Sequence, residues 1–240
     1  MSRLVATMSW DVRLQVRNGF YYAAGFVALF MVVLLLWPSR EDLVWILPVV
    51  IFTNLMINTF YFFSGLVLLE KREGTLEAQV VTPLRTWEYL GSKLATLTAL
   101  AVGENLAITV LAYGVEFRVV PLLLGMLLAA VIYCLVGFAL VARYDSINEF
   151  LMPSFLVSAA FSVPLLPYFG YLEGWWHYLH PLMGPLLLLE AAFVEGPAAP
   201  LASIWEQVYA VAFPLACVVP VFLWSRREFQ RFIVASEGSK

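Results

Sequence analysis

The sequence predicts an all-α integral membrane protein with six transmembrane helices, and three observations support this fold class: composition, apolar runs and the placement of basic residues. Of its 240 residues, 62% are hydrophobic and only 13% are charged, whereas a soluble globular domain carries about 25% charged residues. The mean hydropathy is correspondingly high, at +0.85. The strict alternation of apolar and polar residues that is typical of outer-membrane strands is missing, which disfavours a β-barrel.

Six apolar runs are long enough to cross a bilayer, because about 20 apolar residues in a helix span the roughly 30 Å hydrocarbon core. The first run is too long, and follows too long a segment, to be a cleaved signal peptide, so we keep it in the mature protein. Together the runs define a transmembrane domain over residues 19–225. The predicted spans are residues 19–37, 45–69, 94–113, 119–142, 150–170 and 203–224.

Basic residues fall almost entirely on one side of this six-span topology. Only Arg40 and Arg118 lie on the other side, although the chain has 14 basic residues. Because Lys and Arg are enriched in cytoplasmic loops, we expect both termini, including a tail of residues 226–240, in the cytoplasm. The predicted cytoplasmic basic residues are Arg3, Arg13, Arg17, Lys71, Arg72, Arg85, Lys93, Arg143, Arg226, Arg227, Arg231 and Lys240.

Residues 1–18 precede the first span and have the pattern of an amphipathic helix. Apolar side chains recur every four residues, while most polar side chains fall on other faces. Such a helix is expected to lie in the inner membrane interface, either as a connecting helix or simply as a membrane anchor. The apolar positions are Leu4, Met8, Val12 and Val16, with Val5 beside them, and the polar positions are Arg3, Thr7, Asp11, Arg13, Gln15 and Arg17.

The segment "EKREGTLEAQVVTPLRTWEYLGSK", residues 70–93, is the longest polar stretch of the chain and connects the second and third spans on the cytoplasmic side. We expect short helices at residues 75–79 and 86–93, with Thr75 as the N-cap of the first and the Thr82-Pro83 pair between them. Two antiparallel neighbours need a shorter connection than this. We therefore interpret the segment as an ordered docking element; the alternative is a solvated connection that carries the usual inside charges.

The same segment carries a family resemblance. With its flanks it resembles the segment after the second span of ABC type-2 transporter permeases, also called type V exporters, which read E-x-x-x-G-T-L-E, then T-P, then a tyrosine and a lysine. The stretch "DVRLQVRNGFYYA" near the N-terminus is similar to the fluoroquinolone-export permeases within this class. The motif positions in this chain are Glu70, Glu73, Gly74, Thr75, Leu76, Glu77, Thr82, Pro83, Tyr89, Gly91 and Lys93.

The resemblance implies a six-helix half-transporter in which residues 70–93 hold a coupling helix for a separate nucleotide-binding subunit. The chain has no G-x-x-x-x-G-K-[ST] phosphate loop, so we expect ATP and Mg²⁺ on an ATPase partner and no cofactor on this chain. The residues assigned to coupling with the ATPase are Glu70, Glu73, Gly74, Thr75, Leu76, Glu77, Thr82, Pro83, Arg85, Tyr89 and Lys93.

Assembly and cargo are also implied by the resemblance. We expect two permease copies, most simply a homodimer, in the cytoplasmic membrane of a prokaryote, exporting a small hydrophobic or amphipathic substrate that is drug-like or lipid-like. The chain is expected to act as a transporter subunit rather than as an enzyme of its own. Nucleic acid is not an expected partner, because the net charge is -3 and the basic residues are dispersed.

One carboxyl group falls in the middle of a predicted span. Glu104 lies 11 residues after Lys93, which is about 16 Å along a helix, and Asn58 reaches a similar depth on the preceding span. A carboxyl group at that depth normally faces protein and is hydrogen-bonded. We therefore predict that Glu104 and Asn105 meet Asn54 and Asn58, either as a structural polar clamp or as part of the translocation path.

Two further features are predicted: an aromatic lining of the translocation path and a hairpin on the outer side. An aromatic-rich lining of the path is one interpretation of Tyr21, Tyr22, Phe60 and Tyr61, and packing against lipid explains them equally well. Residues 171–202 contain a short apolar run that is too short to span, so we expect a re-entrant or interfacial hairpin on the outer side, between the fifth and sixth spans.

Two other function classes have weaker support in the sequence. His177 and His180, with Glu173 nearby, have the spacing of a zinc site, but an HExxH motif is missing and Pro181 follows directly. A secondary carrier or channel working alone would favour paired internal repeats and several intramembrane charges, and neither is apparent. Transport without an ATPase partner would be the observation in favour of the carrier.

Overall fold

The described part of the chain consists of helices joined by turns and short connections, with no strand, which confirms the all-α membrane class. The computed structural model describes residues 3–74, 86–171, 174–194, 200–201 and 203–238. Within these residues, four helices are long and apolar enough to cross a membrane. They are the continuous helix Arg40–Arg72, formed by α3 (Arg40–Met56), the π-helical turn η1 (Ile57–Tyr61) and α4 (Phe62–Arg72); α6 (Thr86–Tyr113); α7 (Val119–Val141); and α11 (Ile204–Gly238).

A bent pair of helices at the N-terminus provides a fifth crossing if it is counted as one span. Helix α1 (Arg3–Arg17) meets α2 (Phe20–Leu35) at an angle of 63°. The chain turns there through Gly19, whose φ of 82° is in the left-handed region that glycine adopts without strain. Helix α2 ends shortly before Pro38, because the residue before a proline disfavours helical backbone.

The expected fifth span, residues 150–170, is interrupted. Helix α8 (Ile147–Phe161) has 15 residues, and after a turn through Pro164 the chain continues as the short helix α9 (Leu165–Tyr168). A proline lacks the N–H that would extend the α8 hydrogen-bond ladder. The segment is thus an apolar helix shorter than a full span, whereas the sequence predicted one uninterrupted helix.

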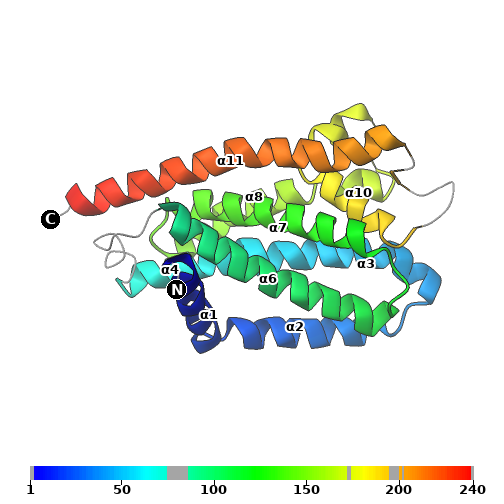
Figure 1. Ribbon diagram of the computed structural model, residues 1–240, viewed down its shortest axis with the longest axis horizontal. Helices are drawn as coiled ribbons and strands as arrows, with labels where there is room; N and C mark the ends of the chain where they lie inside the picture. Colours follow the sequence, from blue (N-terminus) through cyan, green and yellow to red (C-terminus); the bar gives the residue numbers. More distant parts are fainter. Residues whose placement is uncertain (1–2, 75–85, 172–173, 195–199, 202, 239–240) are drawn as a thin grey trace.

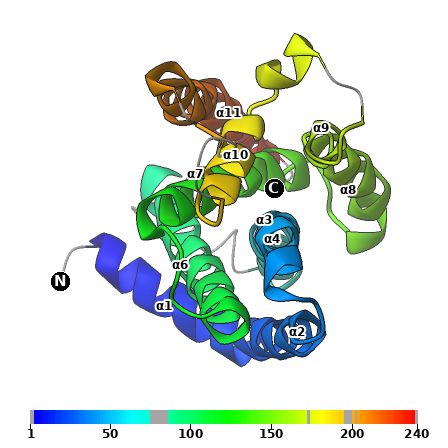
Figure 2. The ribbon, with the colours of Figure 1, turned by 90° about the vertical axis from the view of Figure 1, so that its right-hand side faces the viewer.

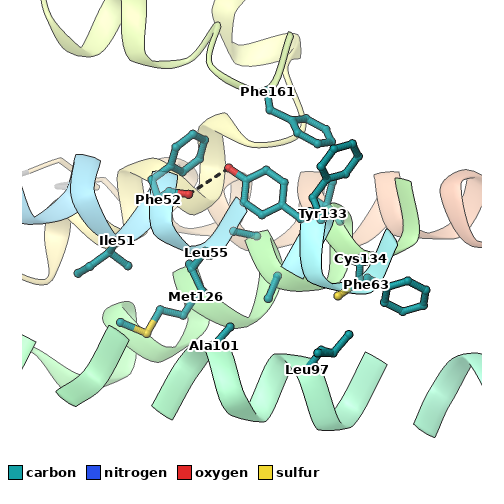
Figure 3. Close-up of a cluster of buried hydrophobic side chains, with 14 of the residues drawn as sticks. Ile51, Phe52, Leu55, Phe63, Leu97, Ala101, Met126, Tyr133, Cys134 and Phe161 are labelled. Carbon is teal, nitrogen blue, oxygen red and sulfur yellow. Dashed lines mark hydrogen bonds between the residues drawn. The ribbon is translucent and has the colours of Figure 1, made fainter. Parts of the chain in front are cut away.

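Helix α7 lies in the middle of the bundle and packs against α3, α4, α6, α10 and α11, as the two views show (Figures 1 and 2). Small residues on α7 allow this close packing: a Cβ atom at Gly125 would lie 2.9 Å from the carbonyl oxygen of Pro185. Aromatic rings fill the centre, where Tyr133 stands 5.8 Å from Phe52 and 4.9 Å from Phe161 between ring centroids (Figure 3).

The short apolar run of the outer hairpin forms α10 (Met183–Ala191), preceded by the 3-10 turn η2 (Trp175–Leu179). Helix α10 is packed among α3, α7 and α11, and most of its side chains are buried. Gly184 is essential to this position, because a Cβ atom there would lie 2.6 Å from the carbonyl oxygen of Ala210. The predicted non-spanning helix is therefore an inserted element of the core rather than a cap on its surface.

The two ends of the bundle differ. Helix α1, the end of α4, the start of α6 and the C-terminal part of α11 lie at one end, and the α2–α3 and α6–α7 connections lie at the other (Figure 1). Helix α11 has 35 residues, about 52 Å at 1.5 Å per residue, and extends well past the other helices (Figure 1).

The predicted short helix over residues 86–93 is wrong as a separate element. Helix α6 runs from Thr86 to Tyr113 without a break, so Tyr89 and Lys93 lie in its first turns rather than in a loop. Gly91 is tolerated inside it, because a glycine weakens a helix by only about 1 kcal/mol. The other predicted helix, residues 75–79, and the Thr82-Pro83 break lie outside the described residues.

A single methyl group should test the packing of α10. Changing Gly184→Ala forces a Cβ atom against backbone and should lower the free energy of unfolding by about 1–3 kcal/mol, measured by thermal unfolding of the purified chain. The matched change Gly103→Ala meets nothing within 4 Å and should be neutral or stabilising by up to about 1 kcal/mol. Equal melting temperatures for the two variants would contradict the described insertion of α10.

Candidate functional site

A buried lysine joins three helices at the end of the bundle that carries α1. Lys93 Nζ of α6 lies 2.7 Å from Asp11 Oδ1 of α1 and 2.5 Å from Glu70 Oε1 of α4. None of these side chains is more than 1% exposed. Ser92 donates a second hydrogen bond to the Asp11 carboxylate. The ammonium group is thus held between two carboxylates from sequence positions about 80 and 20 residues away.

Tyr89 extends this cluster to the rest of the bundle. Its hydroxyl donates to Glu70 Oε2 at 2.7 Å, and the Lys93 ammonium lies 4.7 Å from the centre of its ring. On its other side the ring stacks on Phe229 of α11 at 5.3 Å and approaches Phe138 of α7 at 6.4 Å. Through Tyr89 the lysine cluster, which we define as Asp11, Glu70, Tyr89, Ser92 and Lys93, contacts five helices.

Three residues of the lysine cluster belong to the predicted coupling segment and lie on either side of residues 75–85. Glu70 lies just before residues 75–85, and Tyr89 and Lys93 lie just after them. The structure therefore places these three predicted coupling residues in the interior, where a side chain without exposed surface cannot contact a partner in this conformation. Their geometry instead fixes the spacing of α4 and α6, the two helices from which the segment departs.

The beginning of the segment is described at the surface, as is Trp87 after residues 75–85. Glu73 and Gly74 are exposed, and Gly74 has a φ of 69°, a left-handed conformation that ends α4. Glu73 lies 3.7 Å from Arg17 at the end of α1, a weak surface ion pair. The other predicted coupling residues, Thr75, Leu76, Glu77, Thr82, Pro83 and Arg85, lie outside the described residues.

The placement of Asp11 and Gln15 corrects the prediction for α1. The sequence pattern assigned them to the polar side of a helix in the membrane interface, but both are buried within the protein. Gln15 Nε2 donates to Thr96 of α6 at 2.9 Å. Periodicity missed this because it assumes that polar side chains face water, and the partners of these two residues lie on α6. The one signal in the sequence for this burial was Lys93, a cation next to the start of the predicted third span, where a lysine needs a carboxylate partner if it is buried.

A second polar cluster, which we call the Glu104 cluster, joins α3 and η1 to the middle of α6. Asn58 Nδ2 donates to Glu104 Oε2 at 2.6 Å, and Asn54 Nδ2 lies 3.2 Å from both Glu104 Oε1 and Asn105 Oδ1. All four side chains are buried. The predicted meeting of Glu104 and Asn105 with Asn54 and Asn58 is confirmed.

The Glu104 cluster is incompletely satisfied. Among the described residues, Asn54 Oδ1 and Asn58 Oδ1 are buried and accept no hydrogen bond, and each such atom costs about 1–3 kcal/mol. Within the same part of the chain Glu104 forms no ion pair. Asn105 differs, because its amide also donates to the carbonyl of Ala101 at 2.8 Å. The cluster thus holds one carboxyl group and two unpartnered amide oxygens among buried side chains.

The four predicted lining aromatics do not gather into one group, although Phe60 and Tyr61 contact each other. Phe60 is fully buried in the core and packs edge-on against Tyr61 and Phe161. Tyr61 is half-buried and shares a 2.7 Å hydrogen bond with Ser158 of α8. Tyr22 is exposed on α2, and Tyr21 is half-buried toward α1. Of the four, only Tyr61 places a polar group between the long helix and α8.

The zinc alternative gains no support. No group of three or more metal-ligating side chains occurs among the described residues, and Glu173 lies outside them. His180 Nδ1 accepts a hydrogen bond from the Leu182 backbone at 3.2 Å, and burial lowers the pKa of this imidazole. His180 is thus a neutral histidine that accepts a backbone hydrogen bond in a turn, a role that needs no metal ion.

Two further contacts at the same end as the lysine cluster were not anticipated. Lys71 donates to the carbonyl oxygens of Ala142 and Tyr144, at 3.0 and 2.7 Å, where α7 ends. Arg143 lies 2.6 Å from Glu228 of α11. The sequence predicted only that Lys71 and Arg143 lie on the cytoplasmic side. The contacts join α4, α7 and α11 next to the predicted coupling segment.

Known proteins resemble this chain over its whole length. The sequence model of the fluoroquinolones export permease protein family matches residues 2–237. Two fluoroquinolones export permease proteins of Mycobacterium tuberculosis, from strains CDC 1551 / Oshkosh and ATCC 25618 / H37Rv, are each 33% identical over 240 residues, which cover 99% of this chain and 99% of each relative. No solved structure matches.

Removing the buried ammonium should destabilise the chain strongly. Lys93→Met leaves two carboxylates without their shared partner and should cost about 3–5 kcal/mol, measured by unfolding of the purified chain in detergent. Adding Asp11→Asn should recover part of that loss, because one uncompensated charge is removed. The control Arg13→Met changes an exposed cation on the same α1 helix and should stay within about 0.5 kcal/mol. A double variant no more stable than the single one would contradict the described pairing.

Proposed function

The chain belongs to the fluoroquinolones export permease family, and we propose that it forms the membrane-spanning half of an ATP-driven ABC exporter whose ATPase is a separate subunit. The chain carries no phosphate-binding loop of its own. The observation that best supports this proposal is the lysine cluster, which fixes the helices on both sides of residues 75–85 and joins them to α1, α7 and α11.

In the proposed mechanism, the ATPase pushes on residues 74–85 when it binds ATP. A partner can shift a conformational equilibrium only through contacts that differ between the two states. A force on this segment reaches α4 and α6 at Glu70 and Lys93, and Tyr89 passes it to α7 and α11. Exposed Glu73 and Gly74 belong to the contact surface, whereas buried Glu70, Tyr89 and Lys93 act as positioning residues behind it.

The proposed topology has six crossings with both termini in the cytoplasm of a prokaryotic cell. Two of these crossings are shorter than a full span: α2 forms one of them, and α8 with α9 forms the other. This orientation is supported by the basic residues, which gather at the end that holds α1 and the C-terminal part of α11. The predicted coupling segment then faces the cytoplasm, as contact with an ATPase requires.

We propose that two copies of the chain and two ATPase subunits form the transporter, and that the substrate is a small amphipathic drug of the fluoroquinolone kind. The name of the family supports this substrate class. A cavity of about 750 Å³ lies between the α1–α2 bend, α4 and the turn before α8, a volume in the usual range for a drug-sized ligand. It combines apolar Phe20, Leu68 and Leu69 with polar Arg72 and Asn148, which suits an amphipathic molecule entering from the inner leaflet.

The coupling role is tested by reversing charges in the predicted coupling segment. Glu77→Lys combined with Arg85→Glu should lower substrate-stimulated ATP hydrolysis and export in proteoliposomes containing both subunits by roughly tenfold, within the range of typical coupling energies. The control Arg40→Glu reverses a charge at the opposite end, where Arg40 pairs with Glu116, and should leave coupling intact.

Two outcomes would overturn the proposal. Full hydrolysis and export by the double variant would remove the docking role from the segment. Export by the purified chain alone, driven by an ion gradient without the ATPase, would identify a secondary carrier instead.

A further inference from the structure

Glu104 is a buried carboxyl group that forms no ion pair among the described residues. Helices α2 and α7, which pack on α6, contain no charged residue, and the long helix Arg40–Arg72 carries charges only at its two ends. On α6 itself the nearest base, Lys93, is 11 residues away, or about 16 Å. That ammonium is already bound by two carboxylates. A charge of −1 at Glu104 is therefore uncompensated among the described residues.

In its described arrangement the Glu104 cluster contributes three oxygen atoms at this charge. The carboxylate supplies two, and the side chain of Asn105 supplies a third, 3.2 Å from Asn54 Nδ2. Asn54 and Asn58 now turn their amide nitrogens toward Glu104, which leaves both amide oxygens buried and without a partner among the described residues. Rotating each amide by 180° exchanges nitrogen and oxygen, so two more oxygens would replace the nitrogens that lie 3.2 and 2.6 Å from the carboxylate.

We propose that these five oxygens form a binding site for one alkali cation in the middle of the helix bundle. Carboxylate and amide oxygens are the ligands of hard cations. A monovalent ion neutralises the single carboxylate, whereas a divalent ion would leave one positive charge buried without compensation. Binding gives the two amide oxygens a partner, and the amide N–H groups then take the positions that the oxygens occupy in the described arrangement. The described arrangement, with amide N–H groups on the carboxylate, is the ion-free state of this site.

The backbone at the site supports the proposal independently. Asn58 lies in η1, where the long helix switches from α to π geometry for five residues. Single π turns occur frequently at functional sites, and ion sites in membrane proteins are commonly built where a helix departs from regular geometry. An irregular turn allows Asn58 to approach Glu104 as closely as 2.6 Å while Asn54 contacts both Glu104 and Asn105.

The test measures cation binding to the full-length chain in lipid nanodiscs, so it does not depend on the proposed ATPase partner. Melting temperatures are compared in sodium, potassium, lithium and choline chloride at equal ionic strength and pH. We expect at least one alkali salt to raise the melting temperature above that in choline by about 5–10 °C at a cation concentration about 100 times its Kd. Labelled sodium, potassium or rubidium should bind at one ion per chain.

Variants separate this site from a general salt effect. Glu104→Gln, which removes the charge and keeps the shape, should melt at the same temperature in every salt, and its melting temperature in choline should equal or exceed that of the wild type. The control Glu41→Gln makes the same change at an exposed position of α3 and should keep the full response. Asn58→Asp adds a second carboxylate and should make the chain respond to Ca²⁺.

Three results would overturn the proposal: a wild-type melting temperature that is equal in all four salts, a response to pH alone, or an undiminished alkali response in Glu104→Gln. If Glu104→Gln does not fold, Asn58→Asp decides, because a two-carboxylate variant without any Ca²⁺ response contradicts a cation site at these oxygens.

Discussion

The enclosure of the Lys93 ammonium by Asp11 and Glu70 is the contact on which the arrangement of this end of the bundle depends. Apolar side chains alone could pack α1, α4 and α6 in several rotations, because surfaces rich in Leu, Val and Phe tolerate repacking. A buried ion pair allows far fewer helix rotations, because any rotation that separates the charge from its partners leaves an uncompensated ion in the protein interior. The contacts of Lys93 with Asp11 and Glu70 therefore determine which faces of α1, α4 and α6 pack together. The neighbouring rings of Tyr89, Phe138 and Phe229 pack in the position that these contacts define.

Hydropathy predicted the fold class and the long spans well, because bilayer thickness leaves few solutions for an apolar run of more than 20 residues. Depth along a helix was equally predictable: counting residues placed Glu104 opposite Asn54 and Asn58, and the structure has them in contact. Helix ends were less predictable. The expected start of the third span at residue 94 missed the first two turns of α6, since its polar residues face protein rather than water.

The direction of polar side chains on α1 could not be predicted, for a physical reason. An amphipathicity pattern sorts residues by their preference for water or lipid, and a buried ion pair satisfies neither preference. Asp11 finds its partner 82 positions away, and no local pattern contains that information. The burial of Glu70, Tyr89 and Lys93 behind the predicted coupling segment has the same origin: a motif identifies which residues belong together but not which of them face outward.

The π-helical turn η1 gives the long helix Arg40–Arg72 a property that no straight helix would have. A π turn takes up about one more residue than an α turn, so the half of the helix that carries Asn54 and the half that carries Glu70 keep their relative rotation despite the extra residue. Loss of a single residue in the α-helical parts between Asn54 and Glu70 would turn the second half by about 100° relative to the first. Asn54 would still face Glu104, but Glu70 would point away from Lys93. Loss of one residue within Ile57–Tyr61 is instead absorbed by a return to α geometry, so η1 is the place where this helix is expected to tolerate a change in length.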